Sequence, residues 1–358
     1  MGHEPAVHAI RGAAHELTGA FGDFDALLDR VGDAGCVLLG ESTHGTAQFY
    51  AARAHITKRL IEEKGFAAVA VEADESDARR ACAWARGASD DPDAAAALGD
   101  FTRFARWPWR NHEVAAFLDW LRAHNAATGH AVGFFGLDLH ALHAPNEEGK
   151  GAVGPEAWNR RERHMAQRLE ALRAHLAGAG RPGKVVVWAH NTHVGDGRAT
   201  ELAELGQLTL GRLVRETYGG DEVVLVGQST FTGTVTAAAD WDGPAATMSV
   251  PPARPDAVET LLHEAGPANL MLVLGEDAPA TAALQAARLQ RAIGVLYRPH
   301  TEWISHYVFA DVTRQFDVLI HLDATSALEP LGPAPTARDP GSADALAGTP
   351  PASSARSR

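Results

Sequence analysis

The chain has 358 residues, of which 46% are hydrophobic and 22% charged, a composition typical of a globular protein with a sizeable buried core. Its net charge of −13 argues against non-specific binding to nucleic acid and against docking on anionic lipid. Its two cysteines, Cys36 and Cys82, form no CxxC pair, so the sequence encodes neither a disulfide framework nor a zinc knuckle.

The ends and the hydropathy of the chain bear on its location. The first ten residues lack the charged-then-apolar layout of a signal peptide. No apolar run is long enough to span a membrane. We therefore expect a cytoplasmic protein without a membrane partner.

Short apolar runs predict the strands of a sheet. In chain order they cover residues 36–40, 66–74, 131–138, 184–190, 222–227, 269–275, 292–297 and 316–323. Most are apolar at consecutive positions, which is typical of parallel strands covered on both faces. Helical patterns alternate with the earlier runs, at residues 46–64, 111–127, 156–176 and 200–218. This alternation predicts βαβ units, and hence an α/β fold with a mostly parallel central sheet flanked by helices.

Two segments depart from this alternation. Residues 78–110 contain no strong strand pattern and are interpreted as a helical insertion or lid, in which Trp107 to Trp109 either line a pocket wall or form a packed aromatic elbow. Residues 331–358 are rich in Pro, Ala, Ser and Gly and predict a disordered tail. We therefore expect a single domain over residues 1–330.

Polar, titratable residues follow the first four predicted strands. These strand ends are Gly40–Gly45 (GESTHG), Glu72–Asp74 (EAD), Asp138–His140 (DLH) and His190–His193 (HNTH). In an open parallel sheet, ligands bind outside the carboxyl ends of the strands, so these residues are expected to converge. Carboxylates and imidazoles at one rim are what acid/base chemistry needs.

The GESTHG segment predicts an activated histidine. Gly40 and Gly45 free the backbone of a strand-to-helix turn, and the hydroxyls could cap the next helix. That structural role does not account for Glu41 and His44. A carboxylate three residues before a histidine can fix the imidazole tautomer and raise its basicity.

Arg53 lies on the apolar face of the next predicted helix, at helical spacing with Phe49, Ile56 and Leu60. A buried charge there needs a partner, and Glu41 and Glu72 are the candidates. The alternative is an arginine that reaches solvent at the helix edge.

His190 and His193 directly follow an apolar strand and could face one centre, although either could instead bond only to backbone. Motifs of several other enzyme classes are absent, namely GxSxG, GxxxxGK[ST], GxGxxG after the first strand, and HExxH.

Together these residues resemble the erythromycin esterase family over nearly the whole predicted domain. The resemblance is carried by LLGESTHGT, VEAD, WRNHEV, FFGLDLH, VVVWAHNTHVGD, QLTLGRLVRETYG and YRPHTEWISHY. The WAHNTHVGD segment looks more like homologues labelled succinoglycan-biosynthesis-like than like the resistance enzymes. The catalytic set is therefore expected to transfer better than the macrolide substrate.

The resemblance implies a hydrolase without a metal or other cofactor that opens a macrolide-like lactone or ester. His44 would be the general base, accompanied by Glu41, Glu72, Arg53, His190 and His193. His193 or a backbone N–H near Gly45 would stabilise the oxyanion. The candidate substrate-binding residues are Trp109, Asn111, Asp138, His140, Arg298, His306 and Tyr307.

Three alternatives stay open at this point. The first is a metallohydrolase, in which a zinc or manganese ion is held by Glu41, His44, Glu72, His190 and His193. The second is a biosynthetic cyclase, dehydratase or acyl-transfer enzyme that uses the same base. The third is a binding protein that has lost catalysis. The expected partner is a small-molecule ester or lactone, bound by a monomer or homodimer.

Overall fold

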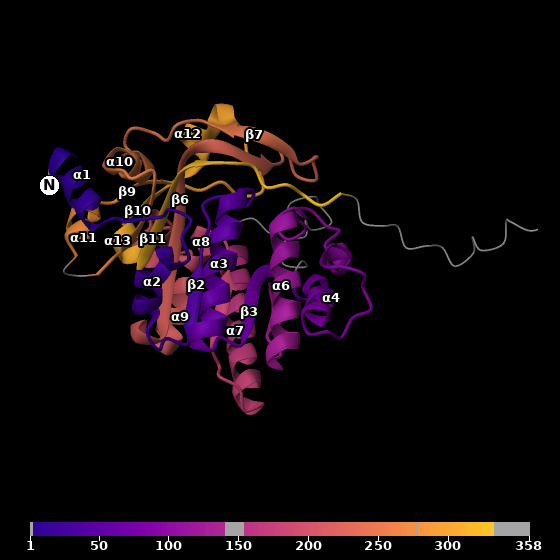
Figure 1. The fold of residues 1–358 in the computed structure, drawn as a ribbon. Coiled ribbons are helices and arrows are strands. Elements are labelled where there is room, and N and C mark those ends of the chain that lie inside the picture. Colours follow the sequence, from indigo (N-terminus) through magenta and orange to yellow (C-terminus); the bar gives the residue numbers. More distant parts are fainter. Residues whose placement is uncertain (1–2, 140–153, 276–277, 333–358) are drawn as a thin grey trace, which may run out of the picture.

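A central sheet runs through the computed structural model, which describes residues 3–139, 154–275 and 278–332 (Figure 1). Its parallel strands are, in spatial order, β11 (Val318–Thr325), β6 (Val223–Ala237), β2 (Cys36–Leu39), β5 (Val185–Trp188), β3 (Ala68–Asp74) and β4 (Gly133–Asp138). Antiparallel strands extend it, with β8 (Asn269–Val273) on β11, β1 (His15–Glu16) on β8, and β7 (Ala246–Val250) on the far half of β6. The predicted α/β fold with a mostly parallel sheet is confirmed.

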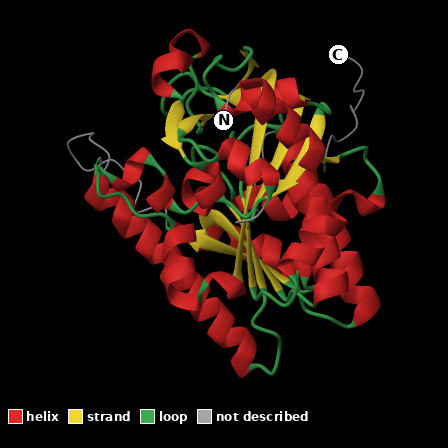
Figure 2. Cartoon of the chain, turned by 90° about the vertical axis from the view of Figure 1, so that its left-hand side faces the viewer, coloured by secondary structure: helices red, strands yellow, loops and turns green. Residues whose placement is uncertain are grey.

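Helices cover both faces of this sheet (Figure 2), because successive residues of a strand point to opposite sides. In β2, Val37 and Leu39 contact one core, whereas Cys36 and Leu38 contact the other. The first core is covered by α2 (Asp25–Val31), α3 (Ala47–Lys64), α4 (Glu75–Ala85), α5 (Ala94–Ala97) and α6 (His112–Thr128). The second is covered by α1 (His3–Ala13), α7 (Pro155–Gly178), α9 (Leu210–Tyr218), α10 (Val258–Ala265) and α11 (Pro279–Leu284). Burial on both faces explains the consecutive apolar residues of the central strands.

The strand register brings the carboxyl ends of the parallel strands to one edge. Leu39 at the end of β2 pairs with Trp188 of β5 and with Val226 of β6. Val71 of β3 pairs with Trp188 and with Gly136 of β4. The residues that follow these positions therefore emerge side by side.

One predicted element is wrong, and another is right only over part of its length. Residues 292–297 form no strand; they make only isolated bridges, between Ile293 and Thr43 and between Leu296 and Ala238. The strand ends before them, at β9 (Arg288–Arg291), which pairs with β10 (Tyr307–Ala310). The predicted helix 200–218 is helical over its second half, because the Thr209 side chain accepts from the Arg212 N–H and caps α9.

The predicted insertion at 78–110 is helical in its first part, where α4 and α5 lie, and irregular from Phe101 onward. Short helices α8 (Asn191–Val194), α12 (Glu302–Ser305) and α13 (Val312–Gln315) complete the chain. Within the described segments, every helix is too short or too polar to traverse a bilayer. The N–H of Leu331 still donates to the Arg110 carbonyl, and residues 333–358 of the predicted tail lie outside the described residues.

Candidate active site

The turn after β2 places His44 against a buried carboxylate. Nδ1 of His44 lies 3.0 Å from Oε1 of Glu41, whose side chain is fully buried. The turn is held by the close approach of β6, since a Cβ on Gly45 would lie 1.9 Å from the carbonyl oxygen of Thr236. A glycine is therefore required at position 45. This close packing of the turn against β6 fixes the backbone next to His44.

Arg53 of α3 holds the other oxygen of this carboxylate. Its Nη2 lies 2.9 Å from Oε2 of Glu41, and both side chains are fully buried. The Arg53–Glu41 contact is an ion pair without hydrogen-bond geometry. None of the three guanidinium nitrogens has a hydrogen-bond partner among the described residues. The guanidinium packs 4.1 Å from the Tyr50 ring centroid and 5.2 Å from that of Trp188. Of the two partners expected for Arg53, the structure selects Glu41.

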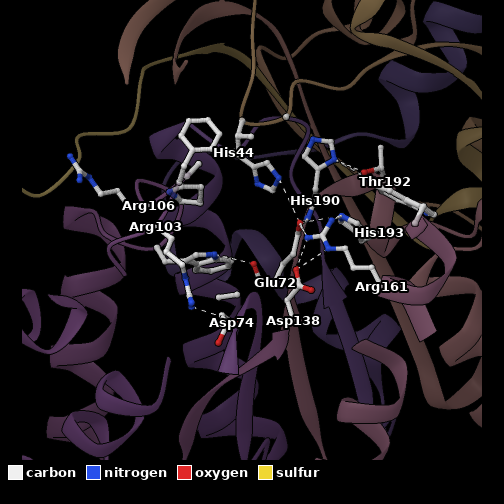
Figure 3. A pocket seen from close by; sticks show the side chains of 18 of the residues that line it. His44, Glu72, Asp74, Arg103, Arg106, Asp138, Arg161, His190, Thr192 and His193 are labelled. Atoms are coloured by element: carbon white, nitrogen blue, oxygen red, sulfur yellow. Dashed lines mark hydrogen bonds and ion pairs between the residues drawn. The ribbon is translucent and has the colours of Figure 1, made fainter. Parts of the chain in front are cut away.

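The opposite edge of the His44 ring faces Glu72 and His190 (Figure 3). Nε2 of His44 lies 3.8 Å from Oε1 of Glu72, and the His44 and His190 ring centroids are 4.8 Å apart. Only 12% of the His44 side chain is exposed. Residues from the turn after β2, from α3, from the end of β3 and from the turn after β5 thus meet.

Glu72 belongs to a second set of charges supplied by α7. Arg161 donates from Nη2 to Oε1 of Glu72 at 2.6 Å and from Nε to Oδ2 of Asp138 at 2.8 Å. Nδ1 of His193 lies 2.5 Å from Glu162, and its Nε2 lies 3.1 Å from Glu72 and 3.0 Å from Nη1 of Arg161. Burial alone would lower the pKa of His193, but the charges of Glu162 and Glu72 outweigh it and raise the pKa to about 9. His193 is therefore an imidazolium at neutral pH.

The same environment sets the state of Glu72. Burial would raise the pKa of this carboxyl, but the charges of His193 and Arg161 hold it well below its usual range. Glu72 is ionised, and its Oε2 accepts from the backbone N–H of His190 at 2.8 Å.

His190 is held neutral in a single tautomer. Its Nδ1 accepts from the backbone N–H of Thr192 at 3.2 Å, so the proton of a neutral ring must lie on Nε2. Burial lowers the pKa of His190 to about 3. Nε2 is buried and has no aligned hydrogen-bond partner within the described chain, although the Ser42 carbonyl lies close enough to favour a proton on this ring. His190 thus has an available N–H beside His44.

These groups form the inner end of a cavity of about 520 Å³. Its inner polar lining comprises His44, Glu72, Asp138, Arg161, His190, Thr192 and His193. Its other walls are largely apolar and include Phe101, Phe104, Pro108, Trp109, Trp158, Leu202, Trp241, Val295 and Val308. This size is within the range of sites for drug-sized ligands.

The structure divides the expected substrate-binding residues. Trp109 and Asp138 line the cavity, and the Trp109 indole donates to the Glu72 carbonyl at 3.0 Å. The described lining includes none of Asn111, Arg298, His306 and Tyr307. His140 lies outside the described residues.

Each residue that is absent from the lining has another contact. The Asn111 side chain accepts from the Val114 N–H and caps α6. Arg298 pairs with Asp240, the His306 ring bonds to the Leu296 carbonyl, and the Tyr307 hydroxyl accepts from the Arg254 N–H. After touching the cavity at 292–295, the chain leaves it over residues 296–307 and returns at Val308 of β10; Tyr307 precedes Val308 in this strand and points to the opposite side.

Sequence reasoning missed Arg161 and Glu162. Trp158, Glu162, Met165 and Leu169 repeat at helical spacing along α7, and the last three of them are buried. A glutamate within such an apolar stripe needs a charged partner, just as Arg53 does in α3. The sequence therefore indicated that Glu162 needs a charged partner. That this partner is His193 depends on the tertiary structure.

The residues of the metal alternative do not fit a metal in this arrangement. The Arg161 guanidinium already bonds Glu72 and Asp138, and His193 directs both ring nitrogens at carboxylates. In the part of the chain that is described, no group of three or more His, Cys, Asp or Glu side chains is arranged to hold a metal ion.

Comparisons with known proteins point to one family. The model of the family described as erythromycin esterase matches residues 61–149 and 147–325. Glu72, His190 and His193 lie within the match, and GESTHG precedes it. The chain is 28% identical over 119 residues to a protein named erythromycin esterase type II from Escherichia coli. That alignment covers 33% of this chain and 27% of the relative, so the chain spans about a quarter of that protein.

Solved structures share the fold at low sequence identity. The crystal structure of a succinoglycan biosynthesis protein matches 91% of this chain and 98% of its own, with a TM-score of 0.68 and 20% identity. A protein from Bacillus cereus matches 93% and 100%, with a TM-score of 0.69 and 18% identity. A mutant of the erythromycin esterase EreC in its open conformation matches 88% and 96%, with a TM-score of 0.57 and 14% identity.

Proposed function

This chain belongs to the erythromycin esterase family, and from that premise we propose that it hydrolyses an ester or lactone, with His44 as the base that activates water. The observation that carries the proposal is the Glu41–His44 pair at the inner end of the cavity. Glu41 accepts a hydrogen bond from the Nδ1–H of His44, so the Nε2 lone pair of the neutral ring is free on the opposite edge, toward the cavity. A macrolide lactone is the first substrate class to test, because the matched relatives are named for erythromycin.

The proposed reaction begins with proton transfer to His44. A water molecule between Nε2 of His44 and Oε1 of Glu72 can be bound by both, since these atoms are 3.8 Å apart. As the water oxygen attacks the ester carbonyl, its proton moves to Nε2. The resulting imidazolium is stabilised by Glu41 and Glu72, and Arg53 keeps Glu41 in place.

The proposed oxyanion donor is His190. The two donors expected from the sequence were His193 and a backbone N–H near Gly45. Both ring nitrogens of His193 are directed at carboxylates, whereas Nε2 of the neutral His190 has an N–H without an aligned partner in the described residues. This N–H can stabilise the tetrahedral intermediate. The intermediate then expels the alkoxide, which takes the proton from Nε2 of His44 and leaves the carboxylic acid.

The test is a screen of macrolides, simple lactones and aryl esters, read by mass spectrometry in water labelled with heavy oxygen. Hydrolysis adds one water, and the label enters the acid product only. A loss of water would instead indicate a cyclase or dehydratase.

On an accepted substrate, His44→Ala should lower kcat by about 10²–10⁴-fold. The matched control is His55→Ala, because His55 is half-buried and packs on Phe24 away from the cavity lining. Thermal unfolding of both variants checks that they are folded. Turnover of His44→Ala at the wild-type rate would show the assignment to be wrong.

A further inference from the structure

Two aromatic side chains from distant segments pack against each other at the rim of the cavity. Phe104 belongs to the irregular segment after α5, and Trp241 belongs to the turn between β6 and β7. Their ring centroids are 4.8 Å apart at an interplanar angle of 56°. Both line the cavity, and both retain exposed surface. We call this pair the aromatic wall.

Packing within the protein does not account for the exposure of this wall. Phe104 is anchored from behind by the buried Trp107, with centroids 5.4 Å apart. Trp241 is 46% exposed and has no aromatic partner other than Phe104 in the described chain. Apolar surface left in water costs free energy in proportion to its area, and an exposed apolar patch at a cavity marks a ligand site. A bound ligand would remove this cost.

Two arginines near Phe104 in the chain also line the cavity but are not part of the wall itself. Arg103 lines the cavity next to Phe104, but its Nη2 donates to Asp77 at 2.6 Å and lies 3.4 Å from Asp74. Arg106 also lines the cavity, and Figure 3 shows its guanidinium directed away from the catalytic imidazoles. The surface offered to a ligand by the wall is therefore apolar and made of ring faces.

We propose that Phe104 and Trp241 bind a flat, uncharged aromatic group of the substrate, attached next to the ester that reaches His44. The substrate class is thus an aryl ester, or an ester with a fused-ring group on one side of the carbonyl. Ring faces favour offset or tilted stacking with another ring over contact with a puckered aliphatic group. That the substrate is an ester rests on the proposed function, but binding of its aromatic group can be tested without catalysis.

The binding test uses naphthol and its saturated counterpart decalol, titrated calorimetrically into the full chain. Wild type should bind naphthol more tightly than decalol. Trp241→Ala and Phe104→Ala should each weaken naphthol binding about tenfold, because a lost stacking contact and its buried area together reach this size. Trp241→Phe should retain most of the affinity.

The matched control is Trp303→Ala. Trp303 is 53% exposed, similar to Trp241, but it is absent from the described cavity lining and should leave naphthol binding unchanged. Equal naphthol affinities of Trp241→Ala and wild type would overturn the proposal. So would equal affinities of wild type for naphthol and decalol, or no binding of naphthol at all.

Catalysis supplies a separate measurement with naphthyl acetate. Trp241→Ala should raise KM about tenfold and leave kcat unchanged, because the wall binds the ring and does not touch the reacting carbonyl. If naphthol binds through Trp241 and naphthyl acetate is not hydrolysed, the aromatic wall stands and the esterase proposal loses its support. If naphthyl acetate is hydrolysed with the same KM in both proteins, the esterase stands and the aromatic wall is wrong.

Discussion

At the inner end of the cavity the side chains are charged, buried and paired, whereas at the rim they are aromatic and partly exposed. Glu72 and His193 line this end, and Glu41 with its partner Arg53 holds His44 from outside the described lining; all four are buried, and each contacts an opposite charge. The aromatic wall of Phe104 and Trp241 has one ring contact and open surface. The inner groups are fixed by the ends of parallel strands, and the rim is built from loops. This contrast indicates that the chemistry is set by the sheet, while the choice of substrate is left to the connections.

The largest expected difference between the two regions is in stability. Arg53→Leu should lower the free energy of unfolding by about 3–5 kcal/mol, because it leaves the buried Glu41 without its charged partner. Arg103→Leu at the rim should cost less than about 1 kcal/mol, since Arg103 is exposed and its pair with Asp77 is screened by water. Urea unfolding of both variants measures the two losses. Similar losses would contradict the contrast between a buried inner end and a solvated rim.

The next effect is on turnover. His190→Phe should lower kcat by about 10²–10³-fold, because it removes the Nε2–H assigned to the oxyanion. KM should change little, since the contact strengthens only in the transition state. The control is His55→Phe, which makes the same substitution at a histidine outside the described cavity lining and should retain wild-type kcat. A drop in kcat of equal size in both variants would exclude a specific role for His190.

A smaller effect is expected in the pH dependence of stability, which should also originate at the inner end. The pKa of His193 is raised to about 9 in the folded protein, above the value of about 6.5 of an unfolded chain. Its contribution, on the order of 3 kcal/mol, is present below about pH 6.5 and is lost as the pH rises through 9. The pKa of His190 is lowered to about 3, so the unfolded chain takes up a proton that the folded protein does not, and stability also falls from about pH 6.5 toward 3.

Urea unfolding between about pH 5 and pH 9.5 should therefore show greatest stability near pH 6.5. Glu162→Gln removes one of the two carboxylates that raise the pKa of His193, so the loss of stability on the alkaline side should become shallower. The readout is the slope with pH, which does not depend on any constant destabilisation by the substitution itself. An unchanged alkaline slope would show that His193 is not the group that titrates.

Much of the candidate site could be predicted, because its residues occupy recognisable positions in the local sequence. Glu41, Glu72, His190 and His193 directly follow apolar runs, and parallel strands end at one edge of a sheet. The position of Arg53 in an apolar helical stripe predicts that it needs a charged partner, and Glu41 and Glu72 are the two candidates. The structure brings all of these groups together around His44.

Other parts of the site could not be predicted because they depend on where loops travel. The segment 292–297 has the composition of a strand, yet it crosses the carboxyl edge of the sheet and contacts the cavity before turning away. Arg298 and His306 lie in the segment that leaves the cavity, and Tyr307 alternates in β10 with Val308, which lines it. Arg161 reaches Glu72 and Asp138 from a helix that is distant in sequence, and only packing of α7 on the sheet sets that distance.

The sequence by itself determined the α/β class and the set of imidazoles and carboxylates, because periodicity and strand ends are local properties of a chain, and its motifs carried the resemblance to the family. Only the tertiary structure decided which carboxylate each cation pairs with and that Phe104 meets Trp241. Those outcomes depend on contacts between segments far apart in the chain, and no local pattern specifies them.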